Sequence, residues 1–101
     1  MPRRRSKSRE NKIKWSELSA KLRQEKPACE VCGKKDNLQC HHVTSKYYHK
    51  SLLRFDERNI AVLCPKCHYI IAHKSPIQFV EWFRRTRSED YGYILRALGV
   101  L

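Results

Sequence analysis

The sequence predicts a small α+β domain in which a strand-strand-helix unit is held together by a four-cysteine zinc site. Cys29 and Cys32 form one C-x-x-C pair, and Cys64 and Cys67 form a second. Each pair can bind a tetrahedral ion through its thiolates, so the two pairs together supply one complete site. A chain of 101 residues is one domain and cannot rely on its apolar core alone. We therefore expect a structural metal to contribute to folding.

The formal net charge of +12 predicts attraction to a polyanion. Nucleic acid is the first candidate, and an anionic membrane surface is the alternative. No apolar run approaches the length of a membrane span, and the basic N-terminus lacks the apolar stretch of a signal peptide. We therefore expect a cytoplasmic protein without a membrane partner. In that compartment paired cysteines bind metal more readily than they form disulfides.

Residues 1–12 are predicted to form a disordered basic arm, because arginine and lysine are interleaved there with serine and no apolar cluster is available. The arm either follows DNA phosphates or only keeps the protein soluble. An amphipathic helix is predicted from about 14 to 26, since Trp15, Leu18 and Leu22 recur at helical spacing. Pro27 marks its end.

Two strands and a short helix are predicted around the second cysteine pair. The first strand covers 38–43, the second covers 59–63, and the helix covers 66–72 and carries His68. The connection over 44–58 is long, and its aromatic residues favour a functional loop over a disordered one.

Two further helices are predicted, because an N-terminal cap motif or start residue is followed in each case by apolar residues at helical spacing. Ser75 is expected to cap the first helix, with Pro76 at its first position. A second helix is expected to start at Ser88. The apolar side chains are interpreted as core rather than as a base-stacking platform. They are Ile77, Phe79, Val80, Trp82 and Phe83 in the first helix, and Tyr91, Ile94, Leu95 and Leu98 in the second.

Several polar residues lie between and after the cysteine pairs. Single cysteines are often buried thiols, and we expect this of Cys40, which has no partner. A lone histidine is usually a satisfied polar or surface residue, but here the grouping favours a site. The residues expected to converge are His41, His42, Asn59 and His68. Convergence is expected because the second cysteine pair immediately precedes His68, so a bound zinc would clamp the hairpin to the helix.

The chain resembles, over 29–73, an HNH endonuclease of the ββα-metal, or His-Me finger, superfamily, in its small zinc-bound phage-type form. The resemblance implies that His42 is the general base that takes a proton from the attacking water. It implies that His41 and His68 are ligands of a divalent catalytic ion, and that Asn59 orients the base or helps to bind that ion. The implied cofactors are structural Zn²⁺ and a catalytic Mg²⁺ or Mn²⁺, with Ni²⁺ or Zn²⁺ as alternatives.

The chemistry makes these residue types sensible, because an anionic phosphodiester resists attack without a base near neutral pKa and a cation on its oxygens. The resemblance implies DNA hydrolysis that leaves a 5′-phosphate and a 3′-hydroxyl.

Two features depart from the family pattern. Val43 follows the doublet in a run without the proline that often occurs there. His73 lies five residues after His68, so an α-helix would not place it on the same face. We expect His73 to be a surface residue, and the alternative is that it is an auxiliary ligand or contacts a phosphate.

Three functions are compatible with these observations. The first is a metal-dependent DNA endonuclease encoded by a phage or prophage, with packaging or recombination proteins as candidate partners. The second is a non-catalytic zinc module that binds nucleic acid, and the third is an adaptor that docks on a larger phage assembly. The internal polar cluster favours the endonuclease, because a binding module does not need it. Residues 13–101 are then a single nuclease domain, with its core at 28–75 and a helical extension at 76–101.

Overall fold

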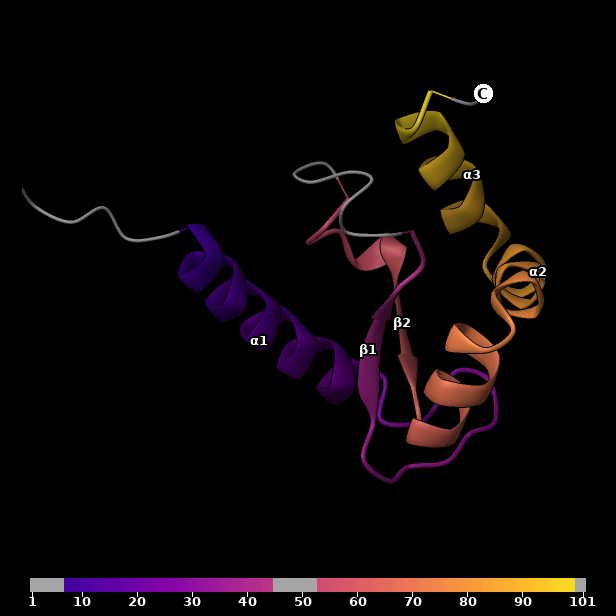
Figure 1. Cartoon of the computed structure of the whole chain (residues 1–101), viewed down its shortest axis with the longest axis horizontal. Coiled ribbons are helices and arrows are strands. Elements are labelled where there is room, and N and C mark those ends of the chain that lie inside the picture. The colour runs from indigo at the N-terminus through magenta and orange to yellow at the C-terminus, as the bar shows by residue number, and fades with distance from the viewer. Residues whose placement is uncertain (1–6, 45–52, 100–101) are drawn as a thin grey trace, which may run out of the picture.

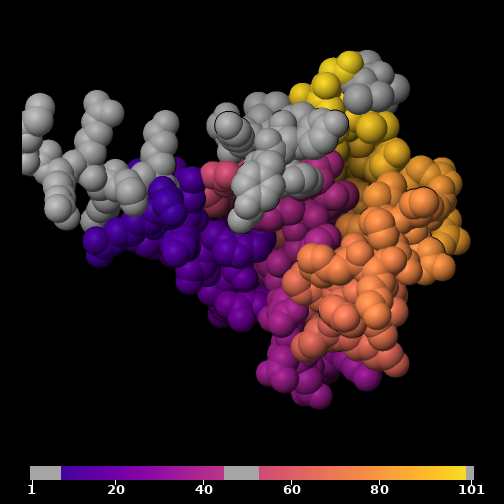
Figure 2. All heavy atoms as spheres, viewed as in Figure 1, coloured from indigo at the N-terminus to yellow at the C-terminus, as the bar shows by residue number. Residues whose placement is uncertain are grey.

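The computed structural model of the protein describes residues 7–44 and 53–99. It places a two-stranded antiparallel sheet between an N-terminal helix and a group of C-terminal helices (Figure 1). In the space-filling view these form lobes on either side of the hairpin (Figure 2). The first half of the predicted basic arm, and Tyr47, Tyr48 and His49 of the predicted loop, lie outside the described residues. The predicted α+β class, with a four-cysteine cluster, is confirmed.

The hairpin consists of β1 (Gln39–His42) and β2 (Ile60–Leu63), in register with Gln39 opposite Leu63 and His42 opposite Ile60. Both predicted strands are therefore present, each within the predicted range. β2 is buried along its whole length, as expected for a strand covered on both faces. Val43 N–H donates to the Asn59 carbonyl at 2.8 Å, which extends the pairing by one step beyond the strands.

The N-terminal helix α1 (Lys7–Glu25) covers one face of the hairpin. Leu22 is buried against Ile60 and Val62, and Trp15 and Leu18 pack around them, so the predicted helical stripe is confirmed. The helix is longer than predicted, and disorder is the wrong prediction for residues 7–12. Nothing in that segment breaks a helix, since it contains neither glycine nor proline, and an acidic residue in the first turn favours a helix start there.

After the second cysteine pair the chain forms η2 (Cys67–His73), a π-helix, where the sequence predicts a short helix. Its wider turn has i→i+5 hydrogen bonds in place of i→i+4. The Lys74 N–H continues this pattern by donating to the Tyr69 carbonyl at 3.1 Å. Before β2, the short 3₁₀ helix η1 (Glu57–Asn59) takes the first residue that was predicted to be strand.

The C-terminal helices are α2 (Pro76–Thr86) and α3 (Ser88–Ala97), with the predicted starts. Ser75 occupies the cap position of α2 but makes no side-chain capping hydrogen bond. Phe83 and Ile94 are buried against Leu53. Two residues of the predicted apolar stripe are not core: Ile77 is 81% exposed and Val80 is 39% exposed. The buried face of α2 runs instead through Phe79 and Phe83, one turn apart. None of the helices in the described part of the chain has the length and apolar character of a membrane span.

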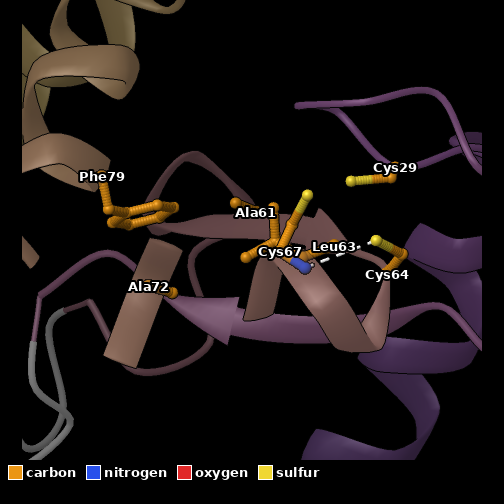
Figure 3. Close-up of a cluster of buried hydrophobic side chains, with 7 residues drawn as sticks. All are labelled: Cys29, Ala61, Leu63, Cys64, Cys67, Ala72 and Phe79. Atoms are coloured by element: carbon orange, nitrogen blue, oxygen red, sulfur yellow. Dashed lines mark hydrogen bonds between the residues drawn. The ribbon is translucent and has the colours of Figure 1, made fainter. Parts of the chain in front are cut away.

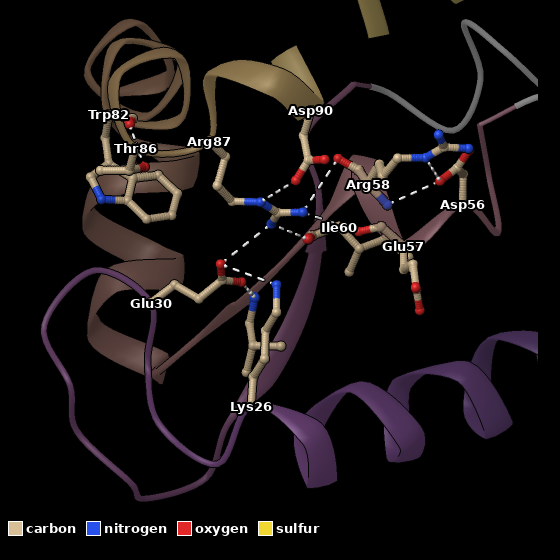
Figure 4. A network of polar contacts seen from close by, with 11 residues as sticks. Lys26, Glu30, Asp56, Glu57, Arg58, Ile60, Trp82, Thr86, Arg87 and Asp90 are labelled. Carbon is tan, nitrogen blue, oxygen red and sulfur yellow. Dashed lines mark hydrogen bonds and ion pairs between the residues drawn. The ribbon is translucent and has the colours of Figure 1, made fainter. Parts of the chain in front are cut away.

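Arg87, between α2 and α3, ties the C-terminal helices to the hairpin and to the first cysteine pair (Figure 4). Its guanidinium donates to the Ile60 carbonyl at 2.6 Å and to Asp90 at 2.8 Å, and it lies 3.3 Å from the Glu30 carboxylate. Glu30 in turn accepts the Val62 N–H at 2.7 Å and donates its own N–H to the Val62 carbonyl at 2.9 Å. One partly buried ion pair therefore fixes the cysteine loop against β2.

Replacing Arg87 with methionine is expected to lower the free energy of unfolding by about 3 kcal/mol. The partly buried Glu30 carboxylate would keep Lys26 but lose Arg87, and the Ile60 carbonyl would lose its guanidinium donor. The matched control is Arg84→Met, which removes an ion pair with Glu81 whose side chains are both 51% exposed. That change is expected to leave the free energy of unfolding close to the wild-type value, because water screens an exposed ion pair. Urea denaturation measures both values, and equal losses in the two variants would contradict the role given to Arg87.

Candidate functional site

The four paired cysteines converge from the first loop and from the start of η2. Their sulfur atoms all lie within 4.8 Å of one another, and the Sγ atoms of Cys32 and Cys64 are 3.5 Å apart. Four thiolates around one tetrahedral zinc lie about 3.8 Å apart, given Zn–S bonds of about 2.3 Å. The cysteines are therefore placed to bind a metal ion, and their donor set fits zinc. Cys29, Cys64 and Cys67 are buried beside Leu63 and Phe79 (Figure 3).

Backbone amides support these sulfurs. The Cys67 N–H donates to the Cys64 Sγ at 3.4 Å. Gly33 closes the first loop with φ of +81°, a conformation that favours glycine, and donates its N–H to the Cys29 carbonyl at 2.9 Å. Burial raises the pKa of Cys29, but backbone hydrogen bonds, first from Cys32 and Cys64, lower it to about 7. Cys29 is thus partly prepared in the thiolate form that binds metal.

Three histidines make a second cluster on the face of the hairpin that meets η2. The His68 Nε2 lies 3.1 Å from the His41 Nδ1 and 3.0 Å from the His73 Nε2. Two ligands of one ion at about 2.1 Å lie about 3.0–3.4 Å apart at octahedral or tetrahedral angles. The three rings can therefore hold a divalent ion together.

Gln39 fixes the orientation of His68. The Gln39 Oε1 lies 2.6 Å from the His68 Nδ1, and an amide oxygen accepts, so Nδ1 carries the proton. Nε2 then has the lone pair toward the cluster, as in metal sites where a histidine donates its other N–H to an oxygen. Sequence reasoning missed Gln39. Gln39 lies two residues before His41 and therefore on the same face of the strand, and this spacing is the sequence signal by which it could have been found.

His73 belongs to the cluster because η2 is a π-helix. The i→i+5 hydrogen bonds of that helix align residues five apart, so His68 and His73 share a face with ring centroids 4.6 Å apart. His73 is exposed, as expected of a surface residue, but it also lies in the cluster, so the alternative of an auxiliary ligand stays a prediction. Because each hydrogen-bonded turn of the π-helix contains one more residue than an α-helical turn, His73 lies beside His68 and not on another face of the helix.

His41 has the most altered protonation in the cluster. Burial, followed by the nearby charges of His68, His73 and His42, lowers the pKa of His41 to about 4. Burial and His73 also lower the pKa of His68. Both rings are therefore neutral at physiological pH, which is the form that binds metal. Phe79 packs its ring edge-on against His41 at 5.1 Å between centroids.

His42 points to the opposite face of β1, because adjacent strand residues alternate. Its ring stacks on Trp15 of α1 at 4.4 Å between centroids with 21° between planes. Its Nε2 lies 2.7 Å from the Arg54 carbonyl, which can only accept, so Nε2 carries the proton. In the neutral ring the lone pair is then at Nδ1. Only one member of the doublet therefore joins the three-histidine cluster, whereas the sequence predicts convergence of both.

Asn59 is buried and is bound to residues on either side of the 45–52 segment. Its Oδ1 accepts from the N–H and the hydroxyl of Thr44, each at 3.0 Å, and its Nδ2 donates to the Leu53 carbonyl at 3.1 Å. The oxygen that a metal would use is thus engaged by two donors. That Asn59 orients the base or helps to bind the metal stays a prediction.

A cleft of about 670 Å³ opens between α1 and the end of the hairpin. His41, His42 and His73 all face it, so the two histidine environments share one opening. Sequence reasoning did not foresee that α1 would form the opposite wall. The residues that line the cleft are Ser8, Asn11, Lys12, Trp15, Cys40, His41, His42, Arg54, Phe55 and His73.

Comparison with known proteins agrees with this geometry. No curated protein and no solved structure matches the chain. A family model described as HNH endonuclease matches residues 29–74, the segment that carries both the cysteine and the histidine clusters. The match indicates a nuclease-type function related to DNA. Residues 29–74 of this chain are therefore similar to the HNH endonuclease family.

Proposed function

We propose that the protein is a metal-dependent endonuclease that hydrolyses DNA phosphodiester bonds. The observation that carries the proposal is the cleft into which a three-histidine cluster and His42 both open. A divalent ion and a general base on one substrate are what phosphodiester hydrolysis requires. The net charge of +12 supports DNA as the substrate, because it favours association with a polyanion.

His41, His68 and His73 are the residues that would hold the catalytic ion, which would polarise the scissile phosphate and stabilise its developing charge. The described residues around this cluster supply imidazole nitrogens and no carboxylate. Such donors suit Zn²⁺ or Ni²⁺ better than Mg²⁺, and Mn²⁺ lies between. Of the ions expected from the sequence, we therefore favour the alternatives Zn²⁺ and Ni²⁺ over Mg²⁺ and Mn²⁺. Structural zinc is assigned to the four cysteines.

His42 is proposed as the general base. Its Nε2–H is held by the Arg54 carbonyl, so Nδ1 is the atom that takes the proton from the attacking water. Stacking on Trp15 restricts rotation of the ring. Asn59 is proposed as a positioning residue, because it holds the Leu53 carbonyl and thereby the next peptide, whose oxygen binds His42.

A plasmid-nicking assay tests the proposal. The protein with zinc loaded at the cysteines is incubated with supercoiled DNA and added Mg²⁺, Mn²⁺, Ni²⁺ or Zn²⁺, beside His42→Ala as the control for a contaminating nuclease. Cleavage by wild type that is lost in the control supports the endonuclease. DNA binding without cleavage under every ion would instead support a non-catalytic zinc-containing module. We also propose a phage origin, a cytoplasmic location, and packaging or recombination proteins as partners.

Replacing His73 with alanine is expected to weaken binding of Ni²⁺ by about 100-fold, because one of three ligands is lost and even supporting residues are worth about 10–100-fold. Calorimetry on zinc-loaded protein measures the affinity. The control is Lys74→Ala, one residue further along the chain, where the side chain lies over the Tyr69 ring and outside the cluster. Unchanged Ni²⁺ affinity in the His73 variant would remove this residue from the ligand set.

A further inference from the structure

The guanidinium of Arg54 lines the cleft, and the proposed hydrolysis gives it no role. Its carbonyl accepts from His42, while its side chain lines the cleft together with His41 and His42. The Arg54 Nε is buried and has no hydrogen-bond partner among the described residues. A buried charged donor without an acceptor is unfavourable, so this position is suited to an acceptor from outside the chain.

None of the aspartate and glutamate side chains, all of which the structure describes, forms an ion pair with this guanidinium. All 10 acidic residues lie within 7–44 and 53–99, so the 45–52 segment contributes none. The ion pairs among the described residues engage other cations, such as Arg58 with Asp56 and Arg87 with Glu30. The residues that line the cleft include no aspartate or glutamate. The cleft is therefore cationic, and an anion is the ligand that it fits.

The opposite wall of the cleft is a face of α1 that precedes the HNH family segment. Ser8, Asn11, Lys12 and Trp15 are spaced at i, i+3, i+4 and i+7, so one helix face presents a hydroxyl, an amide and an ammonium. These are the side-chain types that contact DNA phosphate and sugar. The anion is thus approached by donors from two elements far apart in the sequence.

We propose that Arg54 and Lys12 form a phosphate subsite, in which Arg54 binds a backbone phosphate next to the scissile one and Lys12 holds the strand from α1. The identity of the anion as DNA backbone rests on the proposed function. A guanidinium can bind a phosphate through two parallel N–H donors, which fixes the strand as well as attracting it. The strand is thereby aligned with Nδ1 of His42, whose ring the same residue holds through its carbonyl.

The test is DNA binding without added divalent ion, so that it does not depend on cleavage. Fluorescence anisotropy of a labelled duplex is measured over a salt series for wild type, Arg54→Gln, Arg54→Lys and Lys12→Gln. The matched controls are Arg23→Gln and Lys21→Gln, which remove the same charge from exposed positions of α1 outside the cleft. All variants keep the Arg54 peptide group that binds His42.

Arg54→Gln is expected to raise Kd about tenfold at moderate salt, as expected for a charged hydrogen bond. It should also reduce the slope of log Kd against log salt by about 0.9, one phosphate contact. Lys12→Gln should lower the slope by a similar amount, Arg54→Lys should retain it, and the controls should change Kd less than about twofold. Retention in Arg54→Lys is the readout that a merely structural role would not produce.

Equal Kd and slope for Arg54→Gln and the Arg23 control would overturn the subsite. So would a lowered Tm in both Arg54 variants with an unchanged salt slope, since that would assign the side chain to folding. If wild type cleaves DNA with no metal ion, the proposed function fails, but the binding comparison still decides whether the cleft binds phosphate. If wild type cleaves and the slopes do not change, the endonuclease stands and the subsite falls.

Discussion

Replacing His42 with alanine is expected to slow DNA cleavage by about 10²–10⁴-fold, the usual contribution of a general base. Metal and DNA binding should survive, because the ring does not belong to the three-histidine cluster. The physical reason is the separation of roles within the doublet, in which His41 faces the cluster and His42 stacks on Trp15. Single-turnover nicking with saturating metal measures the chemical step directly.

A ligand variant is the control that separates base from metal effects. His68→Ala should also lose activity, but more metal should restore part of it, since the defect lies in affinity. His42→Ala should not respond to metal in this way. Zinc content at the cysteines should stay at the wild-type level in both. Full activity in His42→Ala would remove that residue as the base.

Replacing Cys67 with serine is expected to release the structural metal and unfold the domain. Structural zinc contributes about 10–16 kcal/mol in small domains, as much as the whole stability of about 5–15 kcal/mol that such a fold has. Cys67 is also buried in the main core cluster, so a serine hydroxyl would lack a partner there. Loss of the cooperative thermal transition, measured by circular dichroism together with metal analysis, is the expected result.

Cys40→Ser is the matched control for that experiment. Cys40 is half-buried on β1, outside the four-cysteine cluster, and its Sγ lies 3.7 Å from the Ser19 carbonyl, which a serine hydroxyl can also approach as a donor. The variant should keep its metal and melt close to wild type. A Cys67 variant that melts cooperatively at the wild-type temperature would contradict the structural role of the metal.

Local sequence signals were sufficient for the two strands, for the starts of α2 and α3 and for the four-cysteine cluster. A C-x-x-C pair fixes two ligands within one turn of backbone, so only one long-range contact had to be assumed. The hairpin followed from a short apolar segment at 60–63 and from the turn residues that bound it. The face of α2 was harder to predict, because Ile77 and Phe79 are equally apolar and only the packing partner decides which is buried.

The sequence by itself predicted the four-cysteine cluster, and it singled out His41, His42, Asn59 and His68 as the residues of interest. The tertiary structure decided which of these residues join the three-histidine cluster and which do not. The backbone hydrogen-bond pattern of η2 brings His73 beside His68, and packing of α1 on the hairpin forms the cleft and places Trp15 on the ring of His42. The cleft and the stacking of Trp15 on His42 depend on contacts between distant segments, and the local spacing of residues does not specify such contacts.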